Sequence, residues 1–439
     1  MFSPFHSLAT VVSGTRRGRW ALVTLVVGGI CAVAMLMSLG AGKAGPIRVG
    51  VLHSLSGTMA ISARPVTEST LMAIDELNAA GGLLGRSIEA VVRDGASDPF
   101  TFAREAERLI TVDGVVATFG CWTSSGRKRV KPIVERHRQL LFYPVQYEGL
   151  EASPAIVYTG AVPNQQIIPA VTWALDNLGR RFFLVGSDYV FPHTAHAIIR
   201  HVTDAIGGEI VGEAYAALGA RELAGTVDAI RRARPDVILN TINGDTNAAF
   251  FRALRAAGIS PAEIPTVSFS IAETELASMG VNGFVGDYAA WNYFQSIDSA
   301  ENRRFVAALR RRLGPGTTAS DPMEAAYLGV HLWARAVQEA GTTATAAVLQ
   351  TLADQSFPAP EGIVYVDGLT HHTWKTVRIG RIRADGQFDI VWHSGRPVRP
   401  TPFPAHRSRA EWEAFQTRLF ERWGRRWVHE GATGSGTLP

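Results

Sequence analysis

The feature that most constrains the fold is an alternation of apolar strand-like segments and amphipathic helical segments, which runs once and then starts again. The first series covers residues 46–165 and includes the apolar segments "IRVGVLHS", "SIEAVVRD" and "GVVATFG". The second series begins at Arg181 with "RFFLVGSDY" and continues to about residue 285. Strands that alternate with helices are typical of a parallel, doubly wound sheet. The sequence therefore predicts an α/β fold with two doubly wound parallel-sheet lobes joined by several crossovers.

Local signals indicate where the helices begin and end. Residues 65–78 have apolar positions at helical spacing and end at "AAGG", which is a C-terminal stop signal. The next helix is expected to begin with Asp98 as its N-cap and Pro99 at its first position. Further helices are predicted over residues 123–136, 192–206, 221–233, 246–257, 299–313 and 322–340.

The last third of the chain has three more strand-like stretches, "GIVYVDG", "WKTVRIGRIR" and "QFDIVWHS". We expect them to return to the first lobe, so that the chain crosses between lobes more than once. The expected division is residues 46–165 for lobe 1, with returning segments from about 290–400, and residues 166–289 for lobe 2. Residues 401–439 form a C-terminal extension. Its amphipathic helix, residues 406–427, is expected to dock on its own domain through the apolar side chains Trp412, Phe415, Leu419 and Trp423.

Residues 1–45 differ from the rest in composition, because they hold four basic residues and no acidic one. The uncharged run 20–42 that follows the arginines is long enough to span a membrane. It equally fits the apolar part of a secretory signal that is cleaved after Ala44. Both alternatives, a signal peptide and an N-terminal membrane anchor, stay open. In either case we expect an exported, periplasmic body.

Composition excludes some classes of function for the body. The chain has a formal net charge of +4, and its first 45 residues carry all of it, so residues 46–439 sum to zero. No basic stripe with interleaved aromatic residues is present, and we expect no nucleic-acid partner. The chain has 2 cysteines, and Cys31 lies in the N-terminal apolar run. Cys121 is thus alone in the body, and the fold must depend on its core rather than on a disulfide.

Polar side chains gather where the predicted parallel strands end, which is where ligands bind in open α/β sheets. The segment "LLFYPVQYEG", residues 140–149, places phenols, an amide and a carboxylate directly after a buried strand. Ser124 opens a predicted helix, whose free N–H groups can hold a carbonyl oxygen. Taken singly, Ser124 also fits a helix cap and the tyrosines fit half-buried packing. Together, donors, aromatic planes and acceptors suit a small, planar, neutral amide. The predicted ligand-binding residues are Trp122, Ser124, Tyr143, Gln146, Tyr189, Asp245 and Glu273.

At these positions the sequence resembles a known family over residues 46–400. It is similar to the type I periplasmic solute-binding proteins of the urea and short-chain amide branch, which includes the substrate-binding proteins of urea ABC transporters. The amide sensor of amidase operons is a more distant member of this branch. The resemblance rests on the strings "NAAGGLLGR", "GCWTSS", "LLFYPVQYEG", "GSDYVFP", "NTINGDTNAAFF", "AAWNYFQSI", "DPMEAAYLGVHLW" and "HHTWKTVRIGRIRADGQFDIVW".

The resemblance implies a two-lobed periplasmic binding protein type I fold that closes on urea, acetamide or formamide and delivers it to ABC permease subunits. By that resemblance Ser124, Tyr143 and Tyr189 occupy amide-contacting positions. Trp122 stands where the amide sensor has a tyrosine. Gln146 and Asp245 differ from the amide sensor, which has a proline and a small residue there, and this difference favours urea.

Other readings of the sequence point to different classes of protein. Cys121 at a strand end could serve a thiol amidase, but no histidine lies near it in sequence to act as a base. His193 and His196 share a predicted helix face without a carboxylate or cysteine to complete a metal-ligand pattern, so no metal or cofactor is expected. A receptor that passes the ligand signal to a membrane partner is the main alternative to transport.

Overall fold

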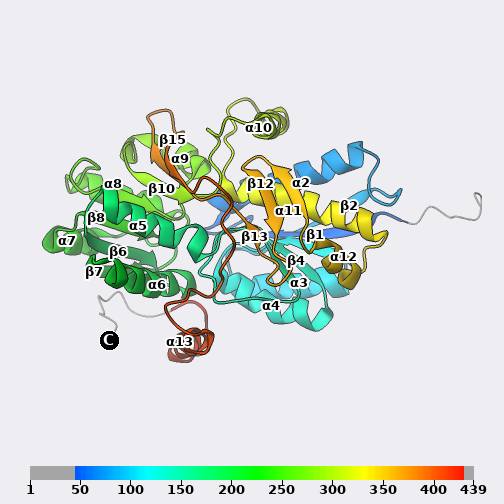
Figure 1. The fold of residues 1–439 in the computed structure, drawn as a ribbon, viewed down its shortest axis with the longest axis horizontal. Helices are drawn as coiled ribbons and strands as arrows, with labels where there is room; N and C mark the ends of the chain where they lie inside the picture. Colours follow the sequence, from blue (N-terminus) through cyan, green and yellow to red (C-terminus); the bar gives the residue numbers. More distant parts are fainter. Residues whose placement is uncertain (1–44, 430–439) are drawn as a thin grey trace, which may run out of the picture. The chain divides into compact units, whose positions relative to one another are not determined.

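The first sheet has five parallel strands in the order β2-β1-β3-β4-β5 (Figure 1). The computed structural model describes residues 45–429. Val49 and Val51 pack on one face of this sheet with the helix that holds Trp333, and Leu52 packs on the other face. The sheet therefore has a core on each side, as the predicted doubly wound lobe requires. Its strands are β1 (Ile47–His53), β2 (Ile88–Asp94), β3 (Ala117–Gly120), β4 (Leu140–Tyr143) and β5 (Ile156–Tyr158).

The helices α3 and α4 begin within one residue of where the sequence predicts, whereas α2 begins at Ala60 instead of residue 65 and α12 was not predicted. Asp98 caps α3, because its carboxylate accepts a hydrogen bond of 2.7 Å from the N–H of Thr101, and Pro99 is the first helical residue. Thr123 caps α4 in the same way, with Gly126 as the donor. The helices that belong to this lobe's cores are α2 (Ala60–Ala79), α3 (Pro99–Thr111), α4 (Ser124–His137), α10 (Ala300–Leu313), α11 (Asp321–Ala340) and α12 (Thr345–Leu352).

The second sheet has seven strands in the order β15-β14-β10-β9-β8-β6-β7. The strands from β10 to β7 are parallel, and β14 and β15 extend the sheet as antiparallel strands. These strands are β6 (Arg181–Ser187), β7 (Glu209–Ala216), β8 (Val237–Thr241), β9 (Thr266–Ser268), β10 (Tyr288–Trp291), β14 (Arg378–Ile382) and β15 (Phe388–His393). Its helices are α5 (Ile167–Asn177), α6 (Val190–Ile206), α7 (Ala224–Ala233), α8 (Thr246–Ala256), α9 (Glu273–Met279) and α13 (Arg409–Arg422), with short 3₁₀ helices η1 (Pro163–Gln165) and η2 (Val281–Gly283).

The prediction that residues 378–393 return to the first lobe is wrong. Both strands belong to the second sheet, and the reason is where their apolar side chains lie. Ile382 and Phe388 are buried in the core of the second lobe. Gly380 allows Phe294 and Phe388 to approach its backbone closely, since a Cβ there would be 2.8 Å from Phe294. The stretch before them does stay with the first lobe, as a small sheet of β11 (Ser356–Ala359), β12 (Gly362–Val366) and β13 (Thr373–Trp374).

Three crossings join the lobes, after β5, after β10 and after β13. The side-chain amide of Asn292 ties them together. Its Nδ2 donates to the carbonyl oxygen of Gln165 at 3.0 Å and to that of Thr376 at 3.2 Å. Multiple crossings with one shared tie are suited to a hinge between two lobes.

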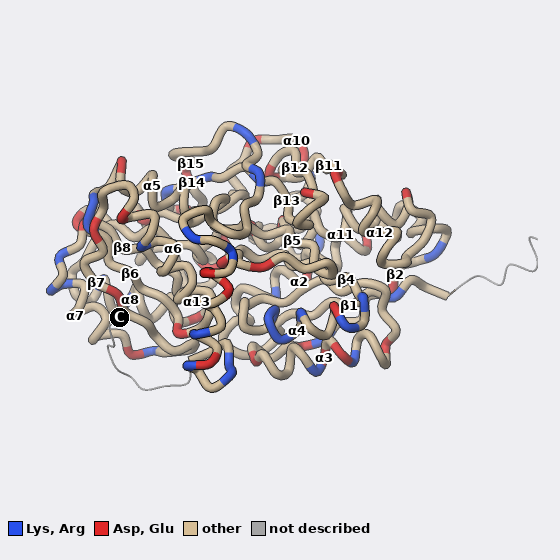
Figure 2. The backbone as a smooth tube through the Cα atoms, turned by 60° about the horizontal axis from the view of Figure 1, so that its bottom comes forward, with Lys and Arg blue, Asp and Glu red and all other residues tan. Residues whose placement is uncertain are grey.

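No helix within residues 45–429 is both long and apolar enough to cross a bilayer. The proposed signal or anchor at residues 20–42 lies outside the described residues. Basic and acidic residues are interspersed along the described chain (Figure 2).

Candidate ligand-binding site between the lobes

The carboxyl ends of the two parallel sheets lie against each other. Gln146, just after β4, donates a hydrogen bond of 2.8 Å from Nε2 to the carbonyl oxygen of Phe269, just after β9. The N–H of Asp245, after β8, donates to the carbonyl oxygen of Thr58 at 3.3 Å. The loops after the first-sheet strands thus meet those after the second-sheet strands, where α/β sheets bind ligands.

Trp122 and Tyr143 form one wall of this boundary from the first lobe. Tyr143 ends β4, and its hydroxyl donates a hydrogen bond of 2.7 Å to the carbonyl oxygen of Trp122. Both side chains are buried. The Tyr143 proton is therefore used inside the protein, and the guanidinium carbon of Arg127 lies 4.8 Å from the centre of the Tyr143 ring.

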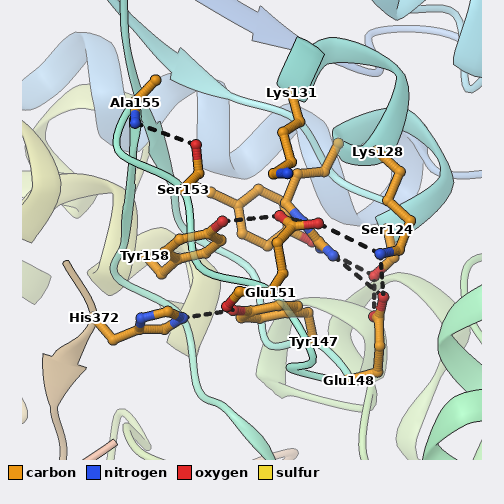
Figure 3. A network of polar contacts seen from close by, with 12 residues as sticks. Ser124, Lys128, Lys131, Tyr147, Glu148, Glu151, Ser153, Ala155, Tyr158 and His372 are labelled. Carbon is orange, nitrogen blue, oxygen red and sulfur yellow. Dashed lines mark hydrogen bonds and ion pairs between the residues drawn. The ribbon is translucent and has the colours of Figure 1, made fainter. Parts of the chain in front are cut away.

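Ser124, at the start of α4, belongs to a buried network of charged side chains (Figure 3). Its hydroxyl donates to Glu148, and it accepts a hydrogen bond of 3.1 Å from Nη1 of Arg127. The Arg127 guanidinium is fully buried and pairs with Glu148 at 3.2 Å and with Glu151 at 3.0 Å. The Ser124 hydroxyl is thus held in place by charged partners.

The charges in this network balance. Lys128 pairs with Glu151 at 3.4 Å and with Glu148 at 3.9 Å, so two cations face two carboxylates. Burial by itself would raise the pKa of Glu151, but Arg127 and Lys128 outweigh burial and hold that pKa at about 2. Both buried cations are therefore committed to internal partners.

Tyr189 approaches this network from the second lobe, at the start of α6. It is buried, and burial raises the pKa of its phenol, to which Tyr143 and Glu148 add through their proximity. Within residues 45–429 its hydroxyl has no hydrogen-bond partner. Tyr189 therefore has both a donor and an acceptor free for a bound molecule.

Gln146 and Glu273 each have one occupied and one unoccupied polar atom. Oε1 of Gln146 is buried without a partner in the described chain. Oε1 of Glu273 accepts a hydrogen bond of 2.7 Å from the N–H of Gln295, and its Oε2 is buried without a partner. Burial raises the pKa of Glu273 to about 8, despite the hydrogen bond from Gln295. At neutral pH the Glu273 carboxyl group is mostly protonated, so it can donate as well as accept.

Asp245 lies at the same boundary but is only partly buried. Its side chain is 40% exposed, and its carboxylate accepts a hydrogen bond from the hydroxyl of Thr58 in the first lobe. Arg221, itself exposed, is 3.9 Å away. Asp245 stands on the loop after β8, where its carboxylate links the two lobes through Thr58.

A profile of the family described as "Periplasmic binding protein domain" matches residues 47–409. This match spans both lobes and all three crossings. The chain belongs to the periplasmic binding protein family. The predicted two-lobed fold of type I is confirmed by it and by the solved structures that resemble the chain.

Individual members of the family resemble the chain over most of its length. The Leu/Ile/Val-binding protein homolog 6 of Brucella melitensis is 24% identical over 361 residues, which cover 79% of this chain and 90% of that protein. A solute-binding protein of an ABC transporter from R. palustris, solved in complex with 4-hydroxybenzoate, superposes with a TM-score of 0.72. It is 23% identical and covers 79% of this chain and 96% of that chain.

A different relative matches only a short part of the chain. A Geobacillus stearothermophilus protein named limonene hydroxylase is 37% identical over 124 residues. The match covers 28% of this chain and 23% of that protein, so the chain spans less than a quarter of its length.

His53, the last residue of β1, was not among the predicted ligand-binding residues of this periplasmic binding protein. His53 is fully buried, and neither of its ring nitrogens has a partner within residues 45–429. Burial lowers the pKa of His53 to about 3, so its imidazole is neutral and offers one donor and one acceptor. The sequence feature that could have indicated His53 as a site residue is its position at the end of the predicted strand "IRVGVLHS". A single histidine at such a position also fits ordinary packing.

Sequence reasoning also missed the pairing of Arg127 with Glu148 and Glu151. The partners are 21 and 24 residues apart along the chain. Only the approach of α4 to the loop after β4 brings them together, and no spacing rule predicts that approach.

The structure gives the thiol amidase reading no support. Cys121 is fully buried, and burial raises the pKa of its thiol to about 12, so a nucleophilic thiolate is absent at neutral pH. His193 and His196 are hydrogen-bonded to Asp188 and Glu213, each at 2.7 Å. In the described part of the chain, no group of three or more His, Cys, Asp or Glu side chains is arranged to hold a metal ion.

Surface hollows of the molecule are lined by residues other than the predicted site residues. Three surface hollows of about 650, 620 and 500 Å³ are lined by other parts of the chain, and none of the seven predicted site residues lines them.

Proposed function

We propose that this solute-binding protein of the ABC-transporter type captures urea, or a closely related short amide, between its lobes and delivers it to a membrane permease. The proposal assigns ligand contact to Trp122, Ser124, Tyr143, Gln146, Tyr189 and Glu273, with His53 as a further candidate. It places the body of the chain outside the cytoplasmic membrane, in keeping with its family.

The observation that carries the proposal is a set of buried polar atoms without partners at the strand ends. Oε1 of Gln146, Oε2 of Glu273 and both ring nitrogens of His53 share this property in the described chain. Buried polar groups in folded proteins nearly always have hydrogen-bond partners, and each exception requires an explanation. Urea, with one carbonyl oxygen and two NH₂ groups on four heavy atoms, can supply acceptors and donors within a small volume.

Charge balance favours a neutral ligand over a carboxylate. Arg127 and Lys128, the buried cations beside Ser124, are both paired with Glu148 and Glu151. A ligand such as 4-hydroxybenzoate, which the R. palustris relative holds, carries a carboxylate that needs an unpaired donor. Binding it beside Ser124 would set its charge against Glu148 without a free cation to offset the repulsion.

The physical limit on affinity is consistent with a transport role. At a ceiling of about −1.5 kcal/mol per heavy atom, four atoms give roughly −6 kcal/mol, or a Kd on the order of tens of micromolar. Reaching this value requires nearly every hydrogen bond of the ligand to be made in a closed, dry site. A ligand that lacks one NH₂ group leaves a buried acceptor unpaired, at a cost of about 1–3 kcal/mol.

Thermal unfolding of the protein with a panel of ligands tests the proposal. We expect millimolar urea to raise Tm, since a ligand at about 100 Kd adds roughly 2.7 kcal/mol of stability. Acetamide and formamide should raise it less, and leucine and 4-hydroxybenzoate should leave it unchanged. A larger rise with acetamide would move the preference to the amide side of the family. A rise only with leucine or 4-hydroxybenzoate would contradict the proposal.

A further inference from the structure

The C-terminal segment, residues 394–429, runs past both lobes after it leaves the second sheet, and we call it the C-terminal strap. It contacts the first lobe through an ion pair of 3.1 Å between Arg399 and Asp367. It then contacts the loop after β4, where the N–H of Leu150 donates a hydrogen bond of 2.8 Å to the carbonyl oxygen of Pro402. Gly149 makes this approach possible. It has a positive φ of 67°, and a Cβ there would be only 2.3 Å from the Pro402 oxygen. The strap therefore packs closely against Gly149 and Leu150 of the first lobe.

The strap is anchored on the second lobe by its helix, α13, which lies beside α6 (Figure 1). Trp412 is fully buried in the core of that lobe and contacts His201 edge-on, with ring centroids 5.9 Å apart. Trp423 contacts His193 in the same way at 4.8 Å. The predicted apolar face of this helix therefore docks on its own lobe, as expected.

The polar side of α13 and the turn after it contact α4 of the first lobe. Nζ of Lys128 donates a hydrogen bond of 3.0 Å to Oε1 of Gln416, and it lies 4.9 Å from the centre of the Trp427 ring. Nη2 of Arg129 donates to the carbonyl oxygen of Arg425 at 3.0 Å. The strap thus connects the helix that begins with Ser124 to the second lobe.

The end of the strap pairs with the turn that carries Tyr189. Val428 forms an antiparallel bridge with Tyr189. The N–H of His429 donates to the carbonyl oxygen of Asp188 at 3.1 Å, and Nδ1 of His429 lies 2.7 Å from the Asp188 carboxylate. The backbone of Tyr189 is therefore held by the strap rather than by its own lobe alone.

We propose that the C-terminal strap is a positioning element for the ligand site, which fixes Tyr189 and clamps the two lobes in the closed arrangement. This role rests on the proposed binding of a ligand between the lobes. The helix of the strap begins at Arg409, the last residue that the family profile matches. Residues 410–429 of the strap therefore extend beyond the part of the chain that the family profile matches.

The test uses the full chain with the double substitution Arg129→Ala and Gln416→Ala, which removes two links between the strap and α4. The control is Arg418→Ala, an exposed residue on the same helix. Urea dissociation is followed by stopped-flow tryptophan fluorescence, and amide hydrogen exchange is measured without urea over residues 124–129 and 188–190. We expect dissociation at least about fivefold faster, faster exchange in both segments, and no change in the control.

The two readouts separate the strap from the proposed ligand. Faster exchange in the double variant, with no urea response in the wild type, would support the strap and overturn urea as the ligand. Unchanged exchange in both segments would overturn the strap whatever the ligand is. Unchanged dissociation of urea from a variant whose wild type binds it would also overturn the positioning role. His429→Ala repeats the test on the second-lobe side, should the double variant fail to fold.

Discussion

The side-chain amide of Gln146 holds the carbonyl oxygen of Phe269 at 2.8 Å, so a residue of the first lobe is bonded directly to the carboxyl edge of the second sheet. The other atom of the same amide, Oε1, is buried and has no partner within residues 45–429. One side chain therefore joins the lobes and leaves an acceptor for an N–H group. If Gln146 contacts the ligand as proposed, closure of the lobes and ligand contact are coupled at this position.

Replacing Gln146 by alanine should weaken urea binding about tenfold or more. The substitution removes an acceptor for the ligand and leaves the Phe269 carbonyl unpaired, each at about 1–3 kcal/mol. Calorimetric titration of the variant measures the affinity. Gln338→Ala, an exposed residue on α11, is the matched control and should bind as the wild type does. Equal affinities for the wild type and the Gln146 variant would remove Gln146 from the site.

Glu273 should make stability depend on pH between about 4.5 and 8. Burial raises its pKa from 4.5 to about 8, so the folded state binds a proton that the unfolded state releases in this range. The contribution of the protonated Glu273 to the free energy of unfolding is fully present below pH 4.5 and is lost as pH rises through 8. Glu273→Gln should remove this pH dependence. At pH 9 the free energy of unfolding of the variant should exceed that of the wild type by at least about 1 kcal/mol. Denaturant unfolding at several pH values measures it, and parallel profiles for the two proteins would contradict the assignment.

Substituting Tyr143 and Tyr189 by phenylalanine should affect different properties, the stability of the fold for Tyr143 and the affinity for urea for Tyr189. Tyr143→Phe leaves the buried carbonyl oxygen of Trp122 without its 2.7 Å donor, so we expect a loss of about 1–3 kcal/mol in the free energy of unfolding. Tyr189→Phe removes a hydroxyl that has no partner in the described chain. Its stability should change by less than about 0.5 kcal/mol, while urea affinity falls about tenfold. Equal effects of both substitutions on stability would contradict this division.

Arg127→Leu should destabilise the protein by about 3–5 kcal/mol, because it leaves the buried carboxylates of Glu148 and Glu151 without their main partner. Arg48→Leu is the control, since Arg48 forms an exposed pair with Glu89 at 3.4 Å and should cost less than about 1 kcal/mol. Urea unfolding is unsuitable if urea is the ligand, so guanidinium unfolding measures both variants. A loss under 1 kcal/mol for Arg127→Leu would show that the network is unimportant for the fold.

The sequence predicted the elements better than their partners in space. Asp98 and Pro99 begin α3 as expected because an N-cap depends on residues only three positions apart. Strands β14 and β15 were assigned to the wrong lobe because their apolar pattern indicates burial without saying which core buries them. That choice depends on packing against Phe294, about 90 residues earlier in the chain.

The same limit applies to the candidate site. Strand ends could be located from the alternation of elements, and this brought Gln146, Tyr189 and Glu273 to one boundary. The depth of a residue within that boundary could not be predicted, and the side chain of Asp245 is 40% exposed there. His53 was passed over because a lone histidine at a strand end is indistinguishable in sequence from a packed one.

We propose that the site between the lobes binds a small neutral amide rather than a carboxylate. Calorimetric titration of the purified protein with urea, and separately with 4-hydroxybenzoate and leucine, tests it most directly. We expect heat of binding with urea at a Kd on the order of tens of micromolar, and no heat with 4-hydroxybenzoate or leucine. Heat with either carboxylate and silence with urea would contradict it.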